Sequence, residues 1–158
     1  MPRVVNSPTR ASLYLSSKDT GFVMEMDAGA HTVHNLHYHV VWVPKYRRRL
    51  LEGRAGLRAE QVIRHVAGEY GFTVDTLKVS PDHIHLLVRL QPRQGIADAV
   101  RTLKSITART LFQEFPELKR HLWKGSLWAD GYCANTVGGL NLDAVRRYIQ
   151  QEQGETPP

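Results

Sequence analysis

Two histidines separated by one residue, His83 and His85, lie inside the apolar segment PDHIHLLV. Alternate residues of a strand point to the same face, so both imidazoles would project together, opposite Ile84 and Leu86. Two neutral imidazoles side by side can share one divalent metal ion. The alternative is a pair of half-exposed surface histidines, and the spacing alone does not decide between the two.

A metal site needs at least one ligand beyond these two histidines. His37 and His39 form a second pair with the same spacing on the first predicted strand. They would either join a histidine-rich metal site or remain ordinary polar residues on the face of a sheet. Asp82 precedes the other pair and would either support the site from behind or only shape the turn.

Near the end of the chain, Tyr148 and Glu152 are four residues apart on a predicted helix and therefore share one face. A tyrosine hydroxyl, with an ordinary pKa of about 10, is a weak nucleophile that needs a Lewis acid or a base beside it. A divalent ion held by His83, His85 and Glu152 would polarise a phosphoryl oxygen next to Tyr148. Tyr148 also borders an apolar stripe, so it could instead pack against the core with its hydroxyl in water.

The chain is basic, with 21 Lys and Arg against 15 Asp and Glu and a formal net charge of +6. This balance predicts an acidic partner, and nucleic acid is the commonest one. The segment KYRRR places Lys45, Arg47 and Arg48 around Tyr46, where cations can neutralise phosphates and the ring can stack on a base. Lys104, on the second predicted helix, adds a further cation that could contact a nucleic-acid backbone. A merely solvated basic loop is the alternative.

The composition is that of one soluble domain, with 158 residues of which 42% are hydrophobic and 23% charged. No apolar run approaches the roughly 18 residues of a membrane span, and the N-terminus lacks the apolar core of a secretory signal. The single cysteine excludes an internal disulfide and a multi-cysteine zinc site. We therefore expect a cytoplasmic protein with no membrane partner.

The apolar patterns predict the elements that would position these groups. We expect residues 1–30 to form an N-terminal arm or extension, 31–153 the domain and 154–158 a tail. Leu57, Val62, Val66 and Tyr70 would line the buried stripe of the first helix, and Asn141 would cap the last helix. The strands are expected within 34–43, 72–82, 83–92 and 126–139, and the helices within 57–70, 95–119 and 141–153.

The order of these elements from position 34 is strand, helix, strand, strand, helix, strand, followed by one more helix. This is the split βαβ, or ferredoxin-like, order. It predicts an α+β fold with a four-stranded antiparallel sheet, helices on one face and a C-terminal helix that bears Tyr148. The strand with His83 and His85 would lie in the middle of the sheet, where it is rigid enough to carry a metal site.

Five segments, in order from about His34 to Gln151, share one resemblance. They are HNLHYHVVWVPKYRRRLL, VSPDHIHLLV, LFQEFPELK, SLWADGYCANTVGG and VRRYIQQ. Together they resemble the single-tyrosine HUH transposases of bacterial insertion sequences, the small TnpA-type enzymes. The resemblance implies that His83 and His85 are the HUH pair, which binds Mg2+ or Mn2+, and that Tyr148 is the nucleophile. One position departs from the family, because Glu152 stands where the family typically has a glutamine as third metal ligand; Gln151 or Gln153 is the alternative for that role.

The resemblance also implies the reaction and the partners. Such enzymes cut and rejoin single-stranded DNA through a 5′-phosphotyrosine, recognise DNA hairpins near the element ends and work as homodimers. The tyrosine helix of one subunit can complete the HUH site of its partner. We therefore expect a metal-dependent DNA transposase at the nucleoid. A non-cleaving or domesticated single-strand binding module of the same fold is the alternative. A double-strand endonuclease is disfavoured, because the sequence offers no cluster of carboxylates for a two-metal site.

Overall fold

The computed structural model describes residues 27–28, 33–122 and 125–151. The predicted arm over 1–30, apart from two residues, and the predicted tail over 154–158 lie outside the described residues. The strands are β1 (Asp27–Ala28), β2 (Val33–His34), β3 (His37–Trp42), β4 (Thr73–Ser80), β5 (His83–Arg89) and β6 (Cys133–Val137). The α-helices are α1 (Gly53–Tyr70), α2 (Ile96–Glu114) and α3 (Leu142–Gln151), with short 3-10 turns at Lys45–Arg47, Pro116–His121 and Gly139–Asn141.

Four strands form an antiparallel sheet in the order β4-β5-β3-β6, and β1 pairs with β2 in a separate small hairpin. This order confirms the predicted ferredoxin-like α+β fold. The two central strands, β3 and β5, pair so that Val41 lies opposite His85 and His39 opposite Leu87. The histidines of the two strands therefore share one face of the sheet.

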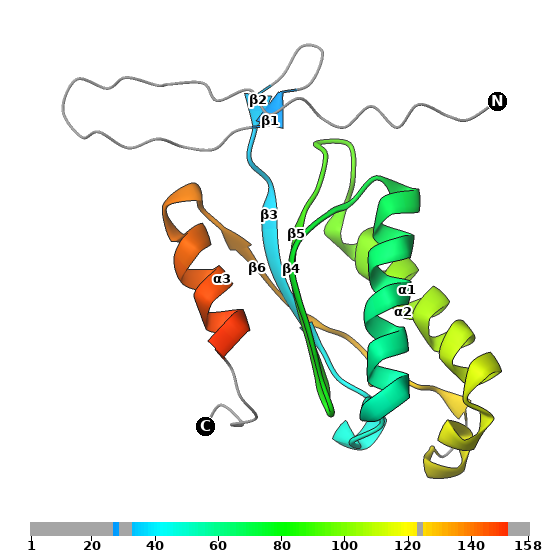
Figure 1. Ribbon diagram of the computed structural model, residues 1–158. Helices are drawn as coiled ribbons and strands as arrows, with labels where there is room; N and C mark the ends of the chain where they lie inside the picture. The colour runs from blue at the N-terminus through cyan, green and yellow to red at the C-terminus, as the bar shows by residue number, and fades with distance from the viewer. Residues whose placement is uncertain (1–26, 29–32, 123–124, 152–158) are drawn as a thin grey trace, which may run out of the picture.

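The helices α1 and α2 cover one face of the sheet, and α3 covers the other (Figure 1). Alternation along β5 separates the two environments, because Ile84, Leu86 and Val88 pack beneath α1 and α2 while the intervening side chains face α3. The core on the side of α1 and α2 is one continuous apolar cluster. Its fully buried members include Val40, Ile63, Ile84, Leu86, Leu103 and Leu111.

The predicted stripe of α1 is wrong at its ends, because Leu57 is 65% and Tyr70 51% exposed. The helix begins at Gly53, and its buried side includes Ala55 and Ala59 as well as Val62 and Val66. Leu57 is two residues from both alanines, which places it about 200° around the helix from Ala55, so it faces solvent. None of the described helices is long and apolar enough to cross a lipid bilayer.

The helix α3 packs on the sheet through a small apolar cluster of its own. Leu142, Val145 and Ile149 of α3 meet Leu87 and Val137 of the sheet. The predicted N-cap, Asn141, lies instead in the 3-10 turn that leads directly into α3, where its amide donates to the Gly138 carbonyl at 2.9 Å. The chain enters α3 through this turn.

Candidate active site

The sheet face under α3 carries His83 and His85, side by side at the start of the central strand β5. Their ring centroids are 4.9 Å apart and the ring planes are nearly perpendicular, at 85°. Both side chains are buried, whereas Ile84 between them points into the core on the opposite face. The spacing left open that both histidines are half-exposed on the surface, and this alternative is wrong because both are buried.

His39 joins this pair from the neighbouring strand β3. Its Nε2 lies 3.0 Å from Nδ1 of His85, a hydrogen-bond distance in which one imidazole donates and the other accepts. The two rings are stacked, with centroids 5.3 Å apart and an interplanar angle of 9°. If His85 Nδ1–H donates, His85 Nε2 carries the lone pair that can bind a metal. His39 thus orients His85. Of the second histidine pair, His39 therefore lies at the proposed metal site.

Asp82 orients the ring of His83 in the same way, by a hydrogen bond to Nδ1. Its Oδ1 lies 2.7 Å from His83 Nδ1, and its Oδ2 accepts a hydrogen bond from Arg47 Nε at 3.2 Å. A carboxylate bonded to Nδ1–H fixes the tautomer that presents Nε2 to a metal. Burial favours protonation of Asp82, but its hydrogen bond to His83 and the charges of His83 and Arg47 outweigh this, and its pKa lies below the ordinary value. Asp82 thus lies in the turn between β4 and β5, and its side chain holds the ring of His83.

Tyr148 projects from α3 toward this histidine group. Its ring centroid lies 6.0 Å from that of His85 and 6.3 Å from that of His39, in both cases edge to face. The side chain is 48% exposed, so it is not packed into the core. A hollow of about 420 Å³ opens beside it between β6 and α3, lined by His39, Asn135, Thr136, Val137, Asn141, Ala144, Val145 and Tyr148. The structure brings Tyr148 and the histidines of β3 and β5 together.

The predicted metal ligands divide into two that the structure describes and one that it does not. His83 and His85 each have Nδ1 in a hydrogen bond, the arrangement usual for metal-binding histidines. These two residues therefore fit a divalent ion. Glu152 lies immediately after the last described residue, and among the described residues no group of three or more His, Cys, Asp and Glu could hold a metal.

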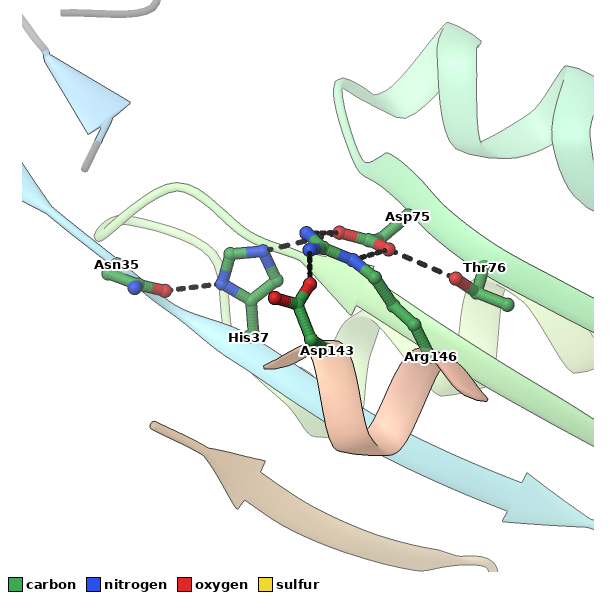
Figure 2. Close-up of polar contacts among 6 residues, drawn as sticks. All are labelled: Asn35, His37, Asp75, Thr76, Asp143 and Arg146. Carbon is green, nitrogen blue, oxygen red and sulfur yellow. Dashed lines mark hydrogen bonds and ion pairs between the residues drawn. The ribbon is translucent and has the colours of Figure 1, made fainter. Parts of the chain in front are cut away.

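A network of polar side chains that the sequence did not predict ties α3 to β4 (Figure 2). Arg146 donates from Nε to Asp75 Oδ1 at 2.8 Å and from Nη2 to Asp75 Oδ2 at 2.6 Å, and from Nη1 to Asp143 Oδ1 at 2.9 Å. Thr76 Oγ1 also donates to Asp75. His37 lies beside the network, with Nε2 3.8 Å from Asp75 Oδ2. His37 also hydrogen-bonds to Asn35 through Nδ1, so its ring links Asn35 to the edge of this network.

Asp75 occupies an irregular position of β4, because the pairing with β5 shifts register between Val74 and Thr76. Burial favours the protonated form of Asp75, but the hydrogen bonds from Arg146 and Thr76 and the charge of Arg146 outweigh it, and the pKa of the carboxyl lies below its ordinary value. The hydrogen bonds to Asp75 in turn raise the pKa of Arg146. The only hint in the sequence is a carboxylate inside the strand segment FTVDTLKV.

The basic segment predicted to contact DNA forms a tight turn after β3. Tyr46 and Arg47 have left-handed backbone conformations, with φ of 60° and 51°, which is strained for side chains of this size. Tyr46 is 59% exposed, and Lys45 Nζ and Arg48 Cζ lie 5.7 and 5.9 Å from the centroid of its ring. Arg47 connects this turn to the histidines through Asp82.

Lys104, the remaining candidate for DNA contact, is half-buried on α2. Its Nζ donates to the carbonyls of Ala129 at 3.0 Å and Gly131 at 2.8 Å. Trp128 Nε1 donates to the Lys104 carbonyl at 2.9 Å. Burial lowers the pKa of Lys104, and the charge of Asp130 only partly offsets this. These contacts hold the segment that leads into β6, so DNA binding by Lys104 stays a prediction.

Comparison with known proteins identifies the family. A family model described as "Transposase IS200 like" matches residues 32–152. The chain is 38% identical over 129 residues to the ISDra2 transposase TnpA of Deinococcus radiodurans, covering 82% of this chain and 92% of the relative. It is 29% identical over 126 residues to the transposase for insertion sequence element IS200 of Salmonella typhimurium, covering 80% of this chain and 82% of the relative.

One solved structure agrees with this family, and a second shares the fold. A crystal structure of a transposase candidate from Deinococcus radiodurans matches with a TM-score of 0.67 and 34% identity, over 81% of this chain and 98% of that one. A REP-associated tyrosine transposase bound to a REP hairpin shares the fold, with a TM-score of 0.56 and 13% identity over 77% of this chain and 70% of that one. The chain therefore belongs to the family of IS200-like transposases, the single-tyrosine transposases of insertion sequences.

Proposed function

We propose that this transposase cleaves and rejoins single-stranded DNA at insertion-sequence ends, with Tyr148 as nucleophile. The observation that carries the proposal is the edge-on position of the Tyr148 ring, 6.0 Å from the ring of His85. The tyrosine oxygen attacks the scissile phosphorus and the bond from phosphorus to the 3′ oxygen breaks. The products are a 5′-phosphotyrosine and a free 3′-OH. Attack by a 3′-OH on the phosphotyrosine reverses the step and joins two strands, so neither water nor a nucleotide is consumed.

His83 and His85 would bind a Mg2+ or Mn2+ ion through Nε2, with Glu152 as the proposed oxygen ligand. When bound, the ion would polarise the scissile phosphate and stabilise the charge that develops there. The protein's own part is to hold the two imidazoles still. Asp82 fixes the ring of His83 and His39 fixes that of His85, because each engages the Nδ1 atom that the ion does not use.

The basic turn would hold the DNA strand as it reaches the site. Arg48 and Arg120 line a hollow of about 450 Å³ together with Tyr46, His121 and Leu122. Neither arginine forms an ion pair with any residue that the structure describes, so both charges can meet phosphates. The exposed ring of Tyr46 can stack on a base, and Lys45 and Arg47 add charge on either side of it. A DNA contact by Lys104 would use its third N–H, since two are bonded to backbone carbonyls.

Trapping of the covalent intermediate tests the nucleophile. Single-stranded oligonucleotides of the element ends are incubated with the protein and Mn2+, and protein–DNA adducts are separated under denaturing conditions. The wild-type protein and the Tyr70→Phe control, which alters an exposed tyrosine of α1, should both form the adduct. Tyr148→Phe should form none. An adduct with Tyr148→Phe would overturn the assignment.

The metal ligands are tested without reference to cleavage. Titration with Mn2+, followed by calorimetry or electron paramagnetic resonance, should show binding that is lost in His83→Ala and in His85→Ala. His65→Ala, which removes an exposed histidine of α1, is the control and should bind as the wild type does. Unchanged binding in both site variants would rule out this ligand pair.

The same reagents distinguish the second candidate, a single-strand binding module that does not cut. Glu152, in place of the family's usual glutamine, favours it, because an added carboxylate beside the scissile phosphate opposes attack by an anionic oxygen. Binding in EDTA with no adduct in Mg2+ or Mn2+ would support this module. A homodimer acting on hairpin ends is part of the main proposal. The related fold of a transposase bound to a REP hairpin supports the hairpin substrate, and the dimer is expected from the family alone.

A further inference from the structure

The charged network drawn in Figure 2 holds Arg146 of α3 against Asp75 of β4. Arg146 and Tyr148 are two residues apart, so on an α-helix they project about 200° from each other around the axis. Arg146 reaches Asp75 on β4, whereas Tyr148 lies over the histidines of β5 and β3. The buried residues of α3 lie between these two flanks. Rotation of α3 about its axis would therefore move the Tyr148 ring across the site.

Few other contacts define this rotation. The described part of α3 spans Leu142–Gln151, and a helix of this length is not stable by itself in water. Its apolar contacts come from Leu142, Val145 and Ile149, and apolar contacts have no preferred direction. A bidentate pair between a guanidinium and a carboxylate fixes both a distance and a plane. The pair of Arg146 and Asp75 thus supplies a directional contact that the apolar cluster lacks.

The acceptor side of the pair is itself held in place. Asp75 is anchored at the irregularity of β4 and bonded by Thr76 at 3.0 Å. Its side chain is 15% exposed and that of Arg146 28%, so water competes little for the bond. Asp143 binds the third nitrogen of the guanidinium from one turn earlier on α3. The guanidinium is therefore held from its own helix and from the sheet at once.

We propose that Arg146 and Asp75 are positioning residues, which set the rotation of α3 and thereby hold Tyr148 over His83 and His85. The inference rests on the proposed function of Tyr148 as nucleophile. Neither residue touches the reacting atoms. Loss of the pair leaves the nucleophile in the protein but displaces it, and displacement by about 1 Å can slow a reaction by as much as a hundredfold.

The first test compares Arg146→Ala with Arg147→Ala. The two substitutions remove the same charge from adjacent positions, but Arg147 is exposed and forms no ion pair with any described residue. Arg146→Ala should slow single-turnover formation of the DNA adduct by about tenfold or more, and Arg147→Ala should not. Affinity for single-stranded DNA in EDTA should be the same in both. A loss of affinity confined to Arg146→Ala would mean that Arg146 binds DNA, and would overturn the positioning role.

Further variants separate positioning from a general loss of structure. Arg146→Lys keeps the charge without the bidentate bond and should recover part of the rate. Asp75→Asn should reproduce the slow rate of Arg146→Ala, and the double variant should be no slower than either, because both remove one interaction. Fully additive effects would show that the two residues act independently and would refute the pair.

The position of Tyr148 can be read directly by nuclear magnetic resonance. Nuclear Overhauser contacts of the Tyr148 ring with His39 and His85 should be present in the wild type and in Arg147→Ala, and lost in Arg146→Ala. Their persistence in Arg146→Ala would overturn the proposal. If the wild type forms no adduct at all, the proposed function fails, yet these contacts still decide whether Arg146 and Asp75 position the ring.

Discussion

The two faces of the sheet are built by different means. Beneath α1 and α2, long helices bury one continuous apolar cluster that includes Trp42, Ile63 and Leu103. On the other face, the short helix α3 rests on a small apolar cluster and on one charged network, and its Tyr148 lies beside the rings of His39 and His85. Stability therefore depends mainly on the first face, and the proposed chemistry depends on the second. Local opening is expected to begin where apolar contacts are fewest, which is at α3.

The largest effect on stability is expected in the core under α2. Leu103→Ala removes a side chain that is completely buried, and such truncations cost about 2–5 kcal/mol. Denaturation by urea should show this loss for the whole domain. If the protein remains folded, the adduct should form at the wild-type rate, because the α3 face is unchanged. A slowed adduct with intact folding would contradict the separation of the two faces.

A smaller and local effect is expected for Ile149→Ala, although Ile149 is also completely buried. Its cavity can be relieved when α3 shifts, so the loss should lie near the lower end of the range, about 2 kcal/mol. Hydrogen exchange should become faster in residues 142–151 and stay unchanged in α1 and α2. Uniformly faster exchange would show that both faces unfold together.

The sequence predicted the first face and part of the second. Alternation along a strand assigns a face to every side chain, so the common orientation of His83 and His85 followed from their spacing. It does not assign neighbours. His37 and His39 also share that face, but His39 meets His85 and His37 meets Asp75, because strand register and the position of α3 decide the contact.

Contacts between distant segments were the least predictable. Arg146 and Asp75 are 71 residues apart in the chain, and neither lies in a pattern that indicates a partner. The sequence predicts a DNA contact for Lys104 because it is a cation on a helix, but it does not show that the Lys104 ammonium lies against two carbonyls. Charge patterns report net attraction to an acidic partner. They do not tell which cations are already bonded within the fold.

An intermediate effect is expected for Asp75→Asn, which leaves Arg146 with a weaker partner on β4. Loss of one partner of a partly buried hydrogen-bonded pair costs about 1–3 kcal/mol. The folded state lowers the pKa of Asp75, so the carboxylate stabilises the fold at pH values above the ordinary pKa. This contribution is lost as the pH falls through the lower pKa of the folded state. The free energy of unfolding, measured by urea denaturation, should therefore fall less between pH 7 and pH 2 in Asp75→Asn than in the wild type. An equal difference would mean that Asp75 contributes nothing to the acid sensitivity.

The smallest effect on stability is expected at Tyr46, which lies outside both cores. Its left-handed backbone, with φ of 60°, favours glycine. Tyr46→Gly should therefore raise the free energy of unfolding by no more than about 1 kcal/mol, or leave it unchanged. The same substitution removes the proposed stacking ring and should weaken single-strand binding, whereas Tyr46→Phe should retain it. Opposite signs for stability and binding would indicate that the strain of this turn serves DNA contact. If Tyr46→Gly bound DNA as tightly as the wild type, the ring would have no part in binding and the strain would need another cause.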